Sequence, residues 1–224
     1  MNWVFQDRQE AGRALAELLA ELLAERNDFR DPVVLALPRG GVPVAAEVAR
    51  ALGAPMDILV VRKLGLPGQP ELAMGAVASG GVEVRNPEVL RQVGLEEAAF
   101  RAVAARETRE LLRREAAYRG RRTPVEVRNR TVLLVDDGIA TGSTVRAAIQ
   151  ALRLRGAEKV VVAVPVAPPD VRRALLSESD EVVCVSTPSP FYAISPWYVE
   201  FPQLSDDEVR EILEVSEGRP PGET

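Results

Sequence analysis

The amino-acid sequence predicts an α/β fold built on a doubly wound, mostly parallel sheet. Strand-like apolar runs alternate with segments of helical periodicity along almost the whole chain, which is typical of βαβ units. The runs 33–37 and 132–135 are apolar at every position, as expected of strands that helices cover on both faces. At 224 residues the chain is long enough for a full core, and we expect a single domain over 1–224.

The composition narrows the classes of function. The formal net charge of −5 argues against nucleic acid as a main partner, since phosphate contacts require a basic surface. The chain has no histidine, which excludes Ser-His and Cys-His catalysis and removes the commonest zinc ligand. Cys184 is the single cysteine and lies in an apolar run, so we expect a buried structural thiol. The sequence shows no export signal and no apolar run of ~18 residues, so we expect a cytoplasmic protein without a membrane partner.

Local signals predict the first helix. Asp7 and Glu10 form a capping-box pattern that starts it. Apolar residues then recur at helical spacing, at Ala11, Leu15, Leu18, Leu19 and Leu22. We therefore expect a helix that packs on the sheet.

The strand 33–37 runs into the sequence PRGGVP and then into a helix with Pro43 in its first turn. Arg39 supplies a fixed positive charge, and Gly40 and Gly41 let backbone N–H groups approach an anion closely. This strand, loop and helix form a candidate phosphate site. By itself, RGG after a strand fits an ordinary turn almost as well.

A further strand is predicted over 56–61, and Arg62 and Lys63 follow it. The next residues are rich in glycine and proline, so we expect a flexible loop over about 63–74. The basic pair is a candidate contact to a bound anion. The alternative is that Arg62 and Lys63 form a solvated pair at the surface.

Two short strand patterns flank Gly80-Gly81, and a glycine pair favours a tight hairpin turn. Helical sequence follows over about 86–120, with a break near Gly94. Its many charges make an amphipathic face that is usually just solvated. We interpret this segment as an insertion that could also form a dimer surface or cover the flexible loop, and we expect a homodimer.

The central stretch is VLLVDDGIATGSTVR, residues 132–146. The apolar run brings Asp136 and Asp137 to the carboxyl end of a strand, where ligands bind in open α/β sheets. Two adjacent acids at that place suit a polyol or a metal ion. The alternative is that they only cap the following helix.

The residues after the acid pair suit a phosphate. Gly138 and Gly142 allow tight turns, and Thr141, Ser143 and Thr144 offer hydroxyls beside the free N–H groups of a helix start. A P-loop is excluded, because no lysine follows the glycine and the acids precede the loop. The helix is expected to end at Gly156, and strands follow over 159–164 and 181–185.

The segment over about 186–204 differs from the rest of the chain. It holds five of the ten aromatic residues, and its prolines prevent a simple helix or a central strand. One interpretation is a hydrophobic plug over the edge of the sheet. Ser205 and Glu208 are then expected to cap a last helix, and the tail 218–224 to be frayed.

The stretch VLLVDDGIATGST closely resembles the phosphoribosyl-diphosphate (PRPP) motif of type I phosphoribosyltransferases, and the resemblance extends over about 33–204. It implies that Asp136 and Asp137 hold the ribose hydroxyls. The 5′-phosphate would then be held by Gly138, Ala140, Thr141, Gly142, Ser143 and Thr144. The resemblance assigns the diphosphate to Arg39, Gly40 and Gly41, in a loop that often carries a non-proline cis peptide.

The same resemblance implies the remaining roles. The loop over about 63–74 would close over the reacting centre, with Arg62 and Lys63 meeting the diphosphate. These two residues and the acid pair Asp136 and Asp137 would be the catalytic residues. Mg²⁺ would arrive with PRPP, with help from Asp136 and Asp137 and without a preformed protein site. The segment 186–204 would be a small C-terminal hood.

The hood would bind the second substrate, a small nitrogenous base. Its WYVEFP sequence resembles the hood of 6-oxopurine enzymes, which makes Trp197 the first candidate for stacking on the base and Phe201 the second. A purine-like base is favoured. Ala140, however, stands where many 6-oxopurine enzymes have an acid, so the general base and the base specificity stay open. The rival hypotheses are a PRPP-sensing regulatory protein that does not turn over and an unrelated sugar-phosphate binder.

Overall fold

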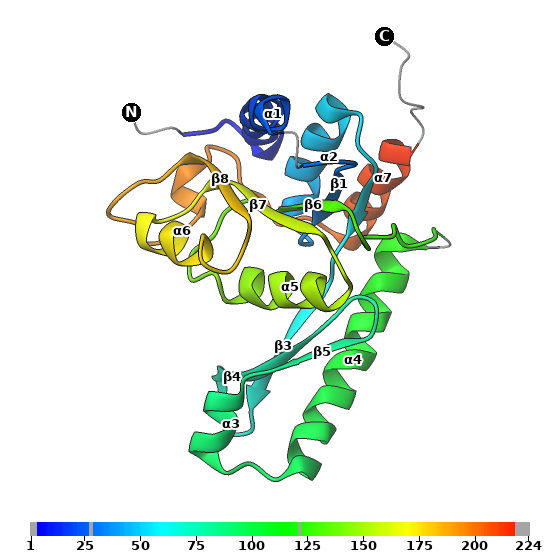
Figure 1. The fold of residues 1–224 in the computed structure, drawn as a ribbon, viewed down its shortest axis with the longest axis vertical. Helices are drawn as coiled ribbons and strands as arrows, with labels where there is room; N and C mark the ends of the chain where they lie inside the picture. The colour runs from blue at the N-terminus through cyan, green and yellow to red at the C-terminus, as the bar shows by residue number, and fades with distance from the viewer. Residues whose placement is uncertain (1–3, 27–28, 121, 218–224) are drawn as a thin grey trace.

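The computed structural model describes residues 4–26, 29–120 and 122–217, and within them the main sheet has five strands, all parallel (Figure 1). The sheet order is β2 (Met56–Ile58), β1 (Val33–Ala36), β6 (Thr131–Val135), β7 (Lys159–Val166) and β8 (Glu181–Ser186). Helices lie on both of its faces, so the predicted doubly wound α/β fold is confirmed.

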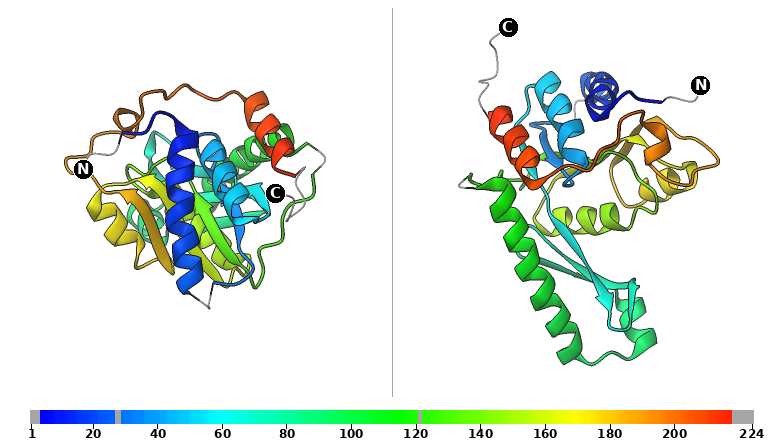
Figure 2. Two further views of the ribbon diagram at one scale, coloured as in Figure 1. Left: turned by 90° about the horizontal axis from the view of Figure 1, so that it is seen from above. Right: turned by 180° about the vertical axis from the view of Figure 1, so that it is seen from behind.

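The two faces of the sheet bury separate apolar clusters. One face carries α1 (Arg8–Glu25), α2 (Gly41–Leu52) and α7 (Asp206–Glu217), and the other carries α5 (Ser143–Leu154) and α6 (Pro169–Leu175). Side chains of β6 alternate between the clusters, because successive residues of a strand point to opposite faces. Both sets are apolar, which explains the uninterrupted apolar run in the sequence. Figure 2 shows α1 and α2 side by side over the sheet.

Residues 61–119 form a projection from the main sheet that we call the arm (Figure 1). It contains an antiparallel sheet of three strands in the described part of the chain, with two helices beside it. The elements are β3 (Val61–Leu66), β4 (Gln69–Ala78), β5 (Val82–Arg85), α3 (Pro87–Val93) and α4 (Glu97–Arg119). The predicted Gly80-Gly81 hairpin and the helix break at Gly94 are confirmed, and all three glycines have positive φ.

The prediction of a flexible loop over about 63–74 is wrong in its secondary structure. These residues belong to the β3–β4 hairpin, in which Leu64 pairs with Gly75 and Val61 with Ala78. A two-residue turn at Pro67 and Gly68 joins the strands, and Gly68 has φ 82°. The glycine and proline content therefore marks a tight turn rather than a long loop. Whether the hairpin moves when a ligand binds stays a prediction.

The predicted strand 56–61 is also divided between the two sheets. It ends in the main sheet at Ile58, and the chain then enters the arm at Val61. Between the two sheets, the hydroxyl of Ser79 accepts a hydrogen bond from the backbone N–H of Val60 at 2.8 Å and holds the chain there. Arg62 and Lys63 consequently lie inside a strand of the arm, not in a loop after a strand.

The arm is anchored by buried contacts of α4. Phe100 and Leu111 are buried against the arm and the main core, so one face of the helix is packed rather than solvated. At the C-terminal end of α4, Arg119 forms an ion pair with Asp57 of β2 in the main sheet at 3.1 Å, and both side chains are less than a tenth exposed. No helix in the described ranges is long and apolar enough to cross a membrane.

The N-terminal prediction is confirmed in its main points. The side chain of Asp7 accepts a hydrogen bond from the N–H of Glu10 at 2.7 Å and starts α1. Leu15 and Leu19 are fully buried, whereas Leu18 lies at the exposed edge of the helix.

Cys184, in β8, is only partly buried, and this burial raises the pKa of its thiol to about 11. The thiol is therefore protonated at neutral pH, which agrees with a structural role.

Candidate functional site

The RGG loop and the acid pair meet at the carboxyl ends of two neighbouring strands. β1 and β6 are paired in register up to Ala36 and Val135, and the N–H of Leu37 donates to the carbonyl of Val135 at 2.8 Å. The loop after β1 and the acids after β6 therefore start side by side. The sequence predicted both features separately, and the sheet brings them together.

The two loops touch so closely that only glycine fits between them. A Cβ atom added to Gly40 would lie 2.0 Å from Oδ2 of Asp137, and one added to Gly41 would lie 2.9 Å from the Cα of Asp136. Gly40 and Gly41 are thus required by the approach of the acid pair itself. The peptide bond between Pro38 and Arg39 is cis, as the resemblance implies.

Arg39 reaches toward the last helix. Its Nη1 lies 3.5 Å from Oδ1 of Asp206 at the start of α7, and both side chains are about two-fifths exposed (41% and 39%). An ion pair this exposed is weak, because water screens it. Arg39 can therefore exchange Asp206 for a stronger anion.

The start of α5 has the turn and the hydroxyl groups that the sequence predicts there, and phosphate binding by them stays a prediction. Gly142 has φ 76° and precedes Ser143, the first residue of the helix. The hydroxyls of Thr141 and Ser143 are 3.4 Å apart, and no acidic side chain lies in the first turn of α5. The N–H of Ile139 donates to the carbonyl of Val166 at 2.9 Å and fixes the loop on β7. Free N–H groups and hydroxyls at a helix start favour an anion.

The acids lie in different environments. Arg8, the first residue of α1, donates from Nε to Oδ2 of Asp137 at 2.8 Å, and both side chains are nearly buried. Oδ1 of Asp136 accepts a hydrogen bond from the N–H of Asp137 at 2.9 Å, and no ion pair of Asp136 occurs within the described residues. Asp136 is also the more exposed of the two.

Burial governs the titration of this pair. Burial raises the pKa of Asp136 well above its ordinary value, and the charge of Asp137 adds to the effect. Burial also raises the pKa of Asp137, while the Arg8 guanidinium acts in the opposite direction. Carboxyl groups perturbed by burial and by each other are common at functional sites.

The hood covers the turn between the acids and the phosphate loop. Ile194 lies so close to Gly138 that an added Cβ would be 2.8 Å from it, and the hydroxyl of Tyr198 donates to the carbonyl of Asp137 at 2.6 Å. Trp197 lies next to Tyr198 in a short 3-10 helix η1 (Ser195–Trp197) and is only partly buried. The ring of Phe191 stacks beside it, with centroids 6.1 Å apart.

Phe201 has different neighbours from those the sequence predicts. The guanidinium carbon of Arg8 lies 3.8 Å from the centre of its ring, and the ring of Tyr198 stacks on it at 4.8 Å. Phe201 therefore contributes to the packing of the hood, as the plug interpretation expects, and its contact with a base stays a prediction. Trp197 remains the candidate for a base.

The two lid candidates are also placed differently from a diphosphate site. Arg62 points to α4, where its Nε donates to Oε2 of Glu107 at 3.0 Å. Lys63 is exposed. Their contact with a diphosphate stays a prediction that requires the arm to rearrange or Arg62 to leave Glu107.

Sequence reasoning missed Arg8 and Tyr198. Arg8 is hidden within a capping pattern, and its acidic partner lies 129 residues further along the chain. Tyr198 belongs to the WYVEFP sequence. Nothing in that sequence indicates that its hydroxyl donates a hydrogen bond to the backbone of Asp137, 61 residues earlier in the chain. The only available signal was the clustering of aromatic residues in the hood.

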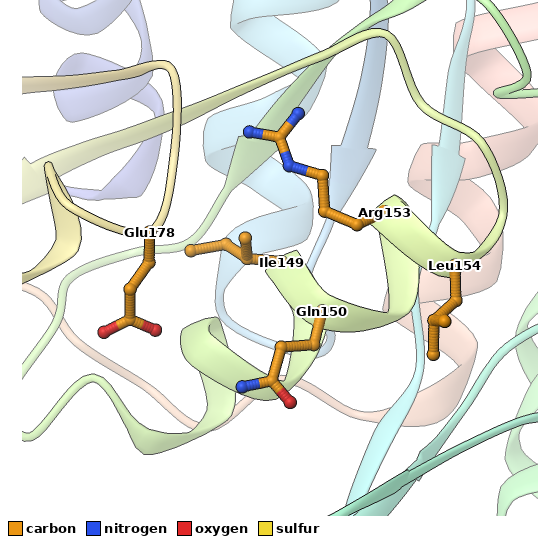
Figure 3. Close-up of a pocket in the computed structure, with 5 residues that line it drawn as sticks. All are labelled: Ile149, Gln150, Arg153, Leu154 and Glu178. Atoms are coloured by element: carbon orange, nitrogen blue, oxygen red, sulfur yellow. The ribbon is translucent and has the colours of Figure 1, made fainter.

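A separate open pocket of about 450 Å³ lies beside the second half of α5 (Figure 3). Its lining residues are Ile149, Gln150, Arg153, Leu154 and Glu178. They belong to the second half of α5 and to the segment after α6, away from the start of α5 at Ser143. None of the predicted site residues lines it, so the loops at the strand ends form the better candidate site.

Comparison with known proteins gives consistent relatives. A family model described as the phosphoribosyl transferase domain matches residues 5–195. Two proteins from Mycobacterium tuberculosis strains, each named "Putative phosphoribosyl transferase", are 49% identical over 211 residues. These matches cover 94% of this chain but 46% of each relative, so the chain spans about half the length of the curated relatives it matches. The crystal structure of TT1426 from Thermus thermophilus is 44% identical, with a TM-score of 0.84 over 94% of this chain and 97% of that chain.

Proposed function

Because the chain belongs to the type I phosphoribosyltransferase family, we propose that it transfers the phosphoribosyl group of PRPP to a nitrogenous base and releases diphosphate. One observation carries the proposal. The RGG loop, the acid pair and the start of α5 meet at one edge of the sheet, with Gly40 in direct contact with Asp137. Such an edge offers acids for a sugar and N–H groups for phosphates at the same place.

Each part of PRPP has a suitable partner in this arrangement. Asp136, the more exposed acid, accepts hydrogen bonds from the ribose hydroxyls, with Asp137 behind it. The start of α5 from Thr141 to Thr144 holds the 5′-phosphate through hydroxyls and free N–H groups. The backbone of Gly40 and Gly41, together with the Arg39 guanidinium, faces the diphosphate.

The proposed reaction is a displacement at ribose C1. A nitrogen lone pair of the base forms the new bond to C1, and the electrons of the C1–O bond leave with the diphosphate. The sugar becomes more positive in the transition state, and fixed carboxylates near it stabilise that charge. Holding both substrates in line supplies much of the remaining advantage. Ala140 has no carboxyl group, so no protein group is assigned to the proton of the base.

The residues present fit Mg²⁺ as a companion of PRPP. Magnesium is usually held by substrate phosphates, waters and one or two carboxylates, and Asp136 is a partly exposed residue whose carboxylate has no ion pair in the described part of the chain. When bound, Mg²⁺ would neutralise charge on the leaving diphosphate. The base would stack on Trp197, and we favour a purine-like ring. A homodimer and a cytoplasmic location stay predictions.

A second candidate function is a PRPP sensor that binds without turnover. Two observations favour it: Arg62 is engaged by Glu107, and Ala140 lacks the acid of 6-oxopurine enzymes. A sensor needs the sugar-phosphate site but no general base. The two candidates share PRPP binding and differ in whether a base is consumed.

One experiment separates these functions. The protein is incubated with Mg-PRPP and a panel of purine and pyrimidine bases, and diphosphate release is measured beside PRPP binding. A transferase releases diphosphate only with a particular base, whereas a sensor binds PRPP and releases none. Absence of PRPP binding would exclude both functions. The Asp136→Asn/Asp137→Asn double variant is the control for contaminating activity.

A further inference from the structure

Arg8 makes three contacts that join different parts of the molecule. Its Nε donates to Asp137, its Nη1 donates to the carbonyl of Pro202 at 2.8 Å, and its guanidinium lies over the ring of Phe201. The side chain is 10% exposed. One guanidinium thus binds the acid pair with one nitrogen and the hood with another. The planar fork of arginine allows this, whereas the single ammonium of lysine would have to choose.

The backbone reinforces the same connection. The segment before α1 pairs with the hood as a short parallel bridge between Phe5 and Tyr198. The N–H of Phe5 donates to the carbonyl of Trp197 at 2.9 Å, and the N–H of Val199 donates to the carbonyl of Phe5 at 2.8 Å. Tyr198 then reaches the carbonyl of Asp137 through its hydroxyl. The N-terminal segment, the hood and the acid pair therefore form one connected unit.

Asp137 also links this unit to the RGG loop, because its carboxylate contacts Gly40. Its carboxylate is held by Arg8 and lies directly against Gly40, where even a methyl group would not fit. A shift of Asp137 toward or away from Arg8 would therefore change the spacing between the acid pair and the loop that faces the diphosphate. A misplacement of about 1 Å near a reacting centre can cost roughly a hundredfold in rate.

Stability alone is a poor reason for this arrangement. Burying an ion pair costs desolvation energy, and apolar residues of similar volume often stabilise a fold as well or better. The buried pair of Arg119 and Asp57 lies away from the candidate site, whereas the partner of Arg8 is one of the two acids of that site, so Arg8 is placed to affect its geometry. Arg13, on the same helix but exposed, shows that α1 carries arginine without any such contact to the acids.

We propose that Arg8 is a positioning residue of the PRPP site, which orients Asp137 against Gly40 and ties the hood to the acid pair. This inference rests on the proposed PRPP-binding function. In this proposal Arg8 itself does not contact PRPP. Its effect passes through Asp137 to the sugar and through Phe201 and Pro202 to the hood.

The test compares three variants by calorimetric titration with Mg-PRPP. Arg8→Met keeps the length of the side chain and its packing on Phe201 but removes the charge and the donors. It should raise the Kd for Mg-PRPP roughly tenfold, within the range of coupling energies between residues in contact. Arg8→Lys keeps the charge and should recover part of the loss. Arg13→Met is the matched control for charge and helix, and it should bind like the wild type.

A double-mutant cycle separates positioning from general stability. If Arg8 acts through Asp137, Arg8→Met should change the Kd less than about threefold in an Asp137→Asn background, because coupled residues are not additive. An equal loss in both backgrounds would overturn the proposal. Tyr198→Phe, which breaks the other link to Asp137 and leaves the ion pair in place, should also weaken Mg-PRPP binding, by less than Arg8→Met.

The outcomes distinguish this inference from the function on which it rests. Wild-type binding of Mg-PRPP together with unchanged binding by Arg8→Met overturns the role of Arg8 and leaves the proposed function standing. Failure of the wild type to bind Mg-PRPP overturns both. If Arg8→Met does not fold, Arg8→Lys and Tyr198→Phe decide, and wild-type affinity in both of these folded variants overturns the proposal.

Discussion

The arm and the strand-end site use their acidic residues in opposite ways. In the arm, Glu97 accepts hydrogen bonds from Arg85 and Arg101, and the contact with Arg85 lowers its pKa to about 2. At the strand ends, burial raises the pKa of Asp136, which has no ion pair within the described residues. Glu97 of the arm is thus committed to arginines of the fold, and Asp137 is likewise paired with Arg8, whereas Asp136 retains capacity for a ligand. In a chain with many acidic and basic residues, the acids paired with arginines are expected to be structural, and an acid with a raised pKa and no ion pair is a candidate for ligand binding.

Substitution of a buried arm anchor should give the largest effect, and only on stability. Arg119→Met leaves Asp57 buried without its ion-pair partner, and breaking a buried pair on one side costs about 3–5 kcal/mol. Chemical denaturation should show this loss while the Kd of the folded protein for Mg-PRPP stays within about threefold of the wild type. A large change in Kd at unchanged stability would remove the distinction between arm and site.

Gly40→Ala should give the reverse result. The added methyl group would collide with the Asp137 carboxylate, so the RGG loop and the acid pair must move apart. We expect the Kd for Mg-PRPP to rise about tenfold or more, measured by titration, because displacement of the loop or the acids loses at least one charge-assisted hydrogen bond to the ligand. Gly81→Ala in the arm is the control: nothing lies within 4 Å of its Cβ, and its φ of 74° costs stability without touching the site. Equal Mg-PRPP affinity in the two variants would contradict the site.

Trp197→Ala tests the hood without disturbing the sugar site. Base–aromatic stacking is worth roughly 1–3 kcal/mol, so the KM for the base should rise roughly ten- to hundredfold while PRPP binding barely changes. Fluorescence offers an independent measurement, because base-dependent quenching should vanish in Trp197→Ala and survive in Trp3→Phe. Trp3 lies outside the described residues. Equal loss of base and PRPP binding would mean that WYVEFP only plugs the fold.

The β3–β4 hairpin should give the smallest effect, visible as a change in protection. If Arg62 or Lys63 meets the diphosphate, Mg-PRPP should slow proteolytic cleavage between Lys63 and Met74. The hairpin is paired along much of its length, so we expect a change of a few-fold rather than full protection of a disordered loop. Cleavage at equal rates with and without the ligand would show that the hairpin is not a lid.

Sequence reasoning succeeded where one segment carries its own signal. The apolar run before Asp136, the glycine turn at Gly142 and the Gly80-Gly81 hairpin are local, and each was placed correctly. It failed where the partner is distant. The glycine and proline content around Pro67 fits a loop as well as a two-residue turn, and only pairing with β4 decides between them.

The candidate site shows the same limit. Its motifs could be predicted because strand, turn and helix follow one another in the chain. The contact between Gly40 and Asp137 depends on the order of strands in the sheet, which no single segment specifies. Arg8 was missed for the same reason, since only the folded chain brings α1 and the hood to the acid pair.

The most direct test of the strand-end site is calorimetric titration of Mg-PRPP into the wild type and into the Asp136→Asn/Asp137→Asn double variant. Hydrogen bonds to charged groups contribute about 1.5–3 kcal/mol each, so the double variant should bind at least about tenfold more weakly. Both substituted residues follow a strand end, and circular dichroism should show a folded protein. A folded double variant with wild-type affinity for Mg-PRPP would contradict the assignment of this edge of the sheet as the PRPP site.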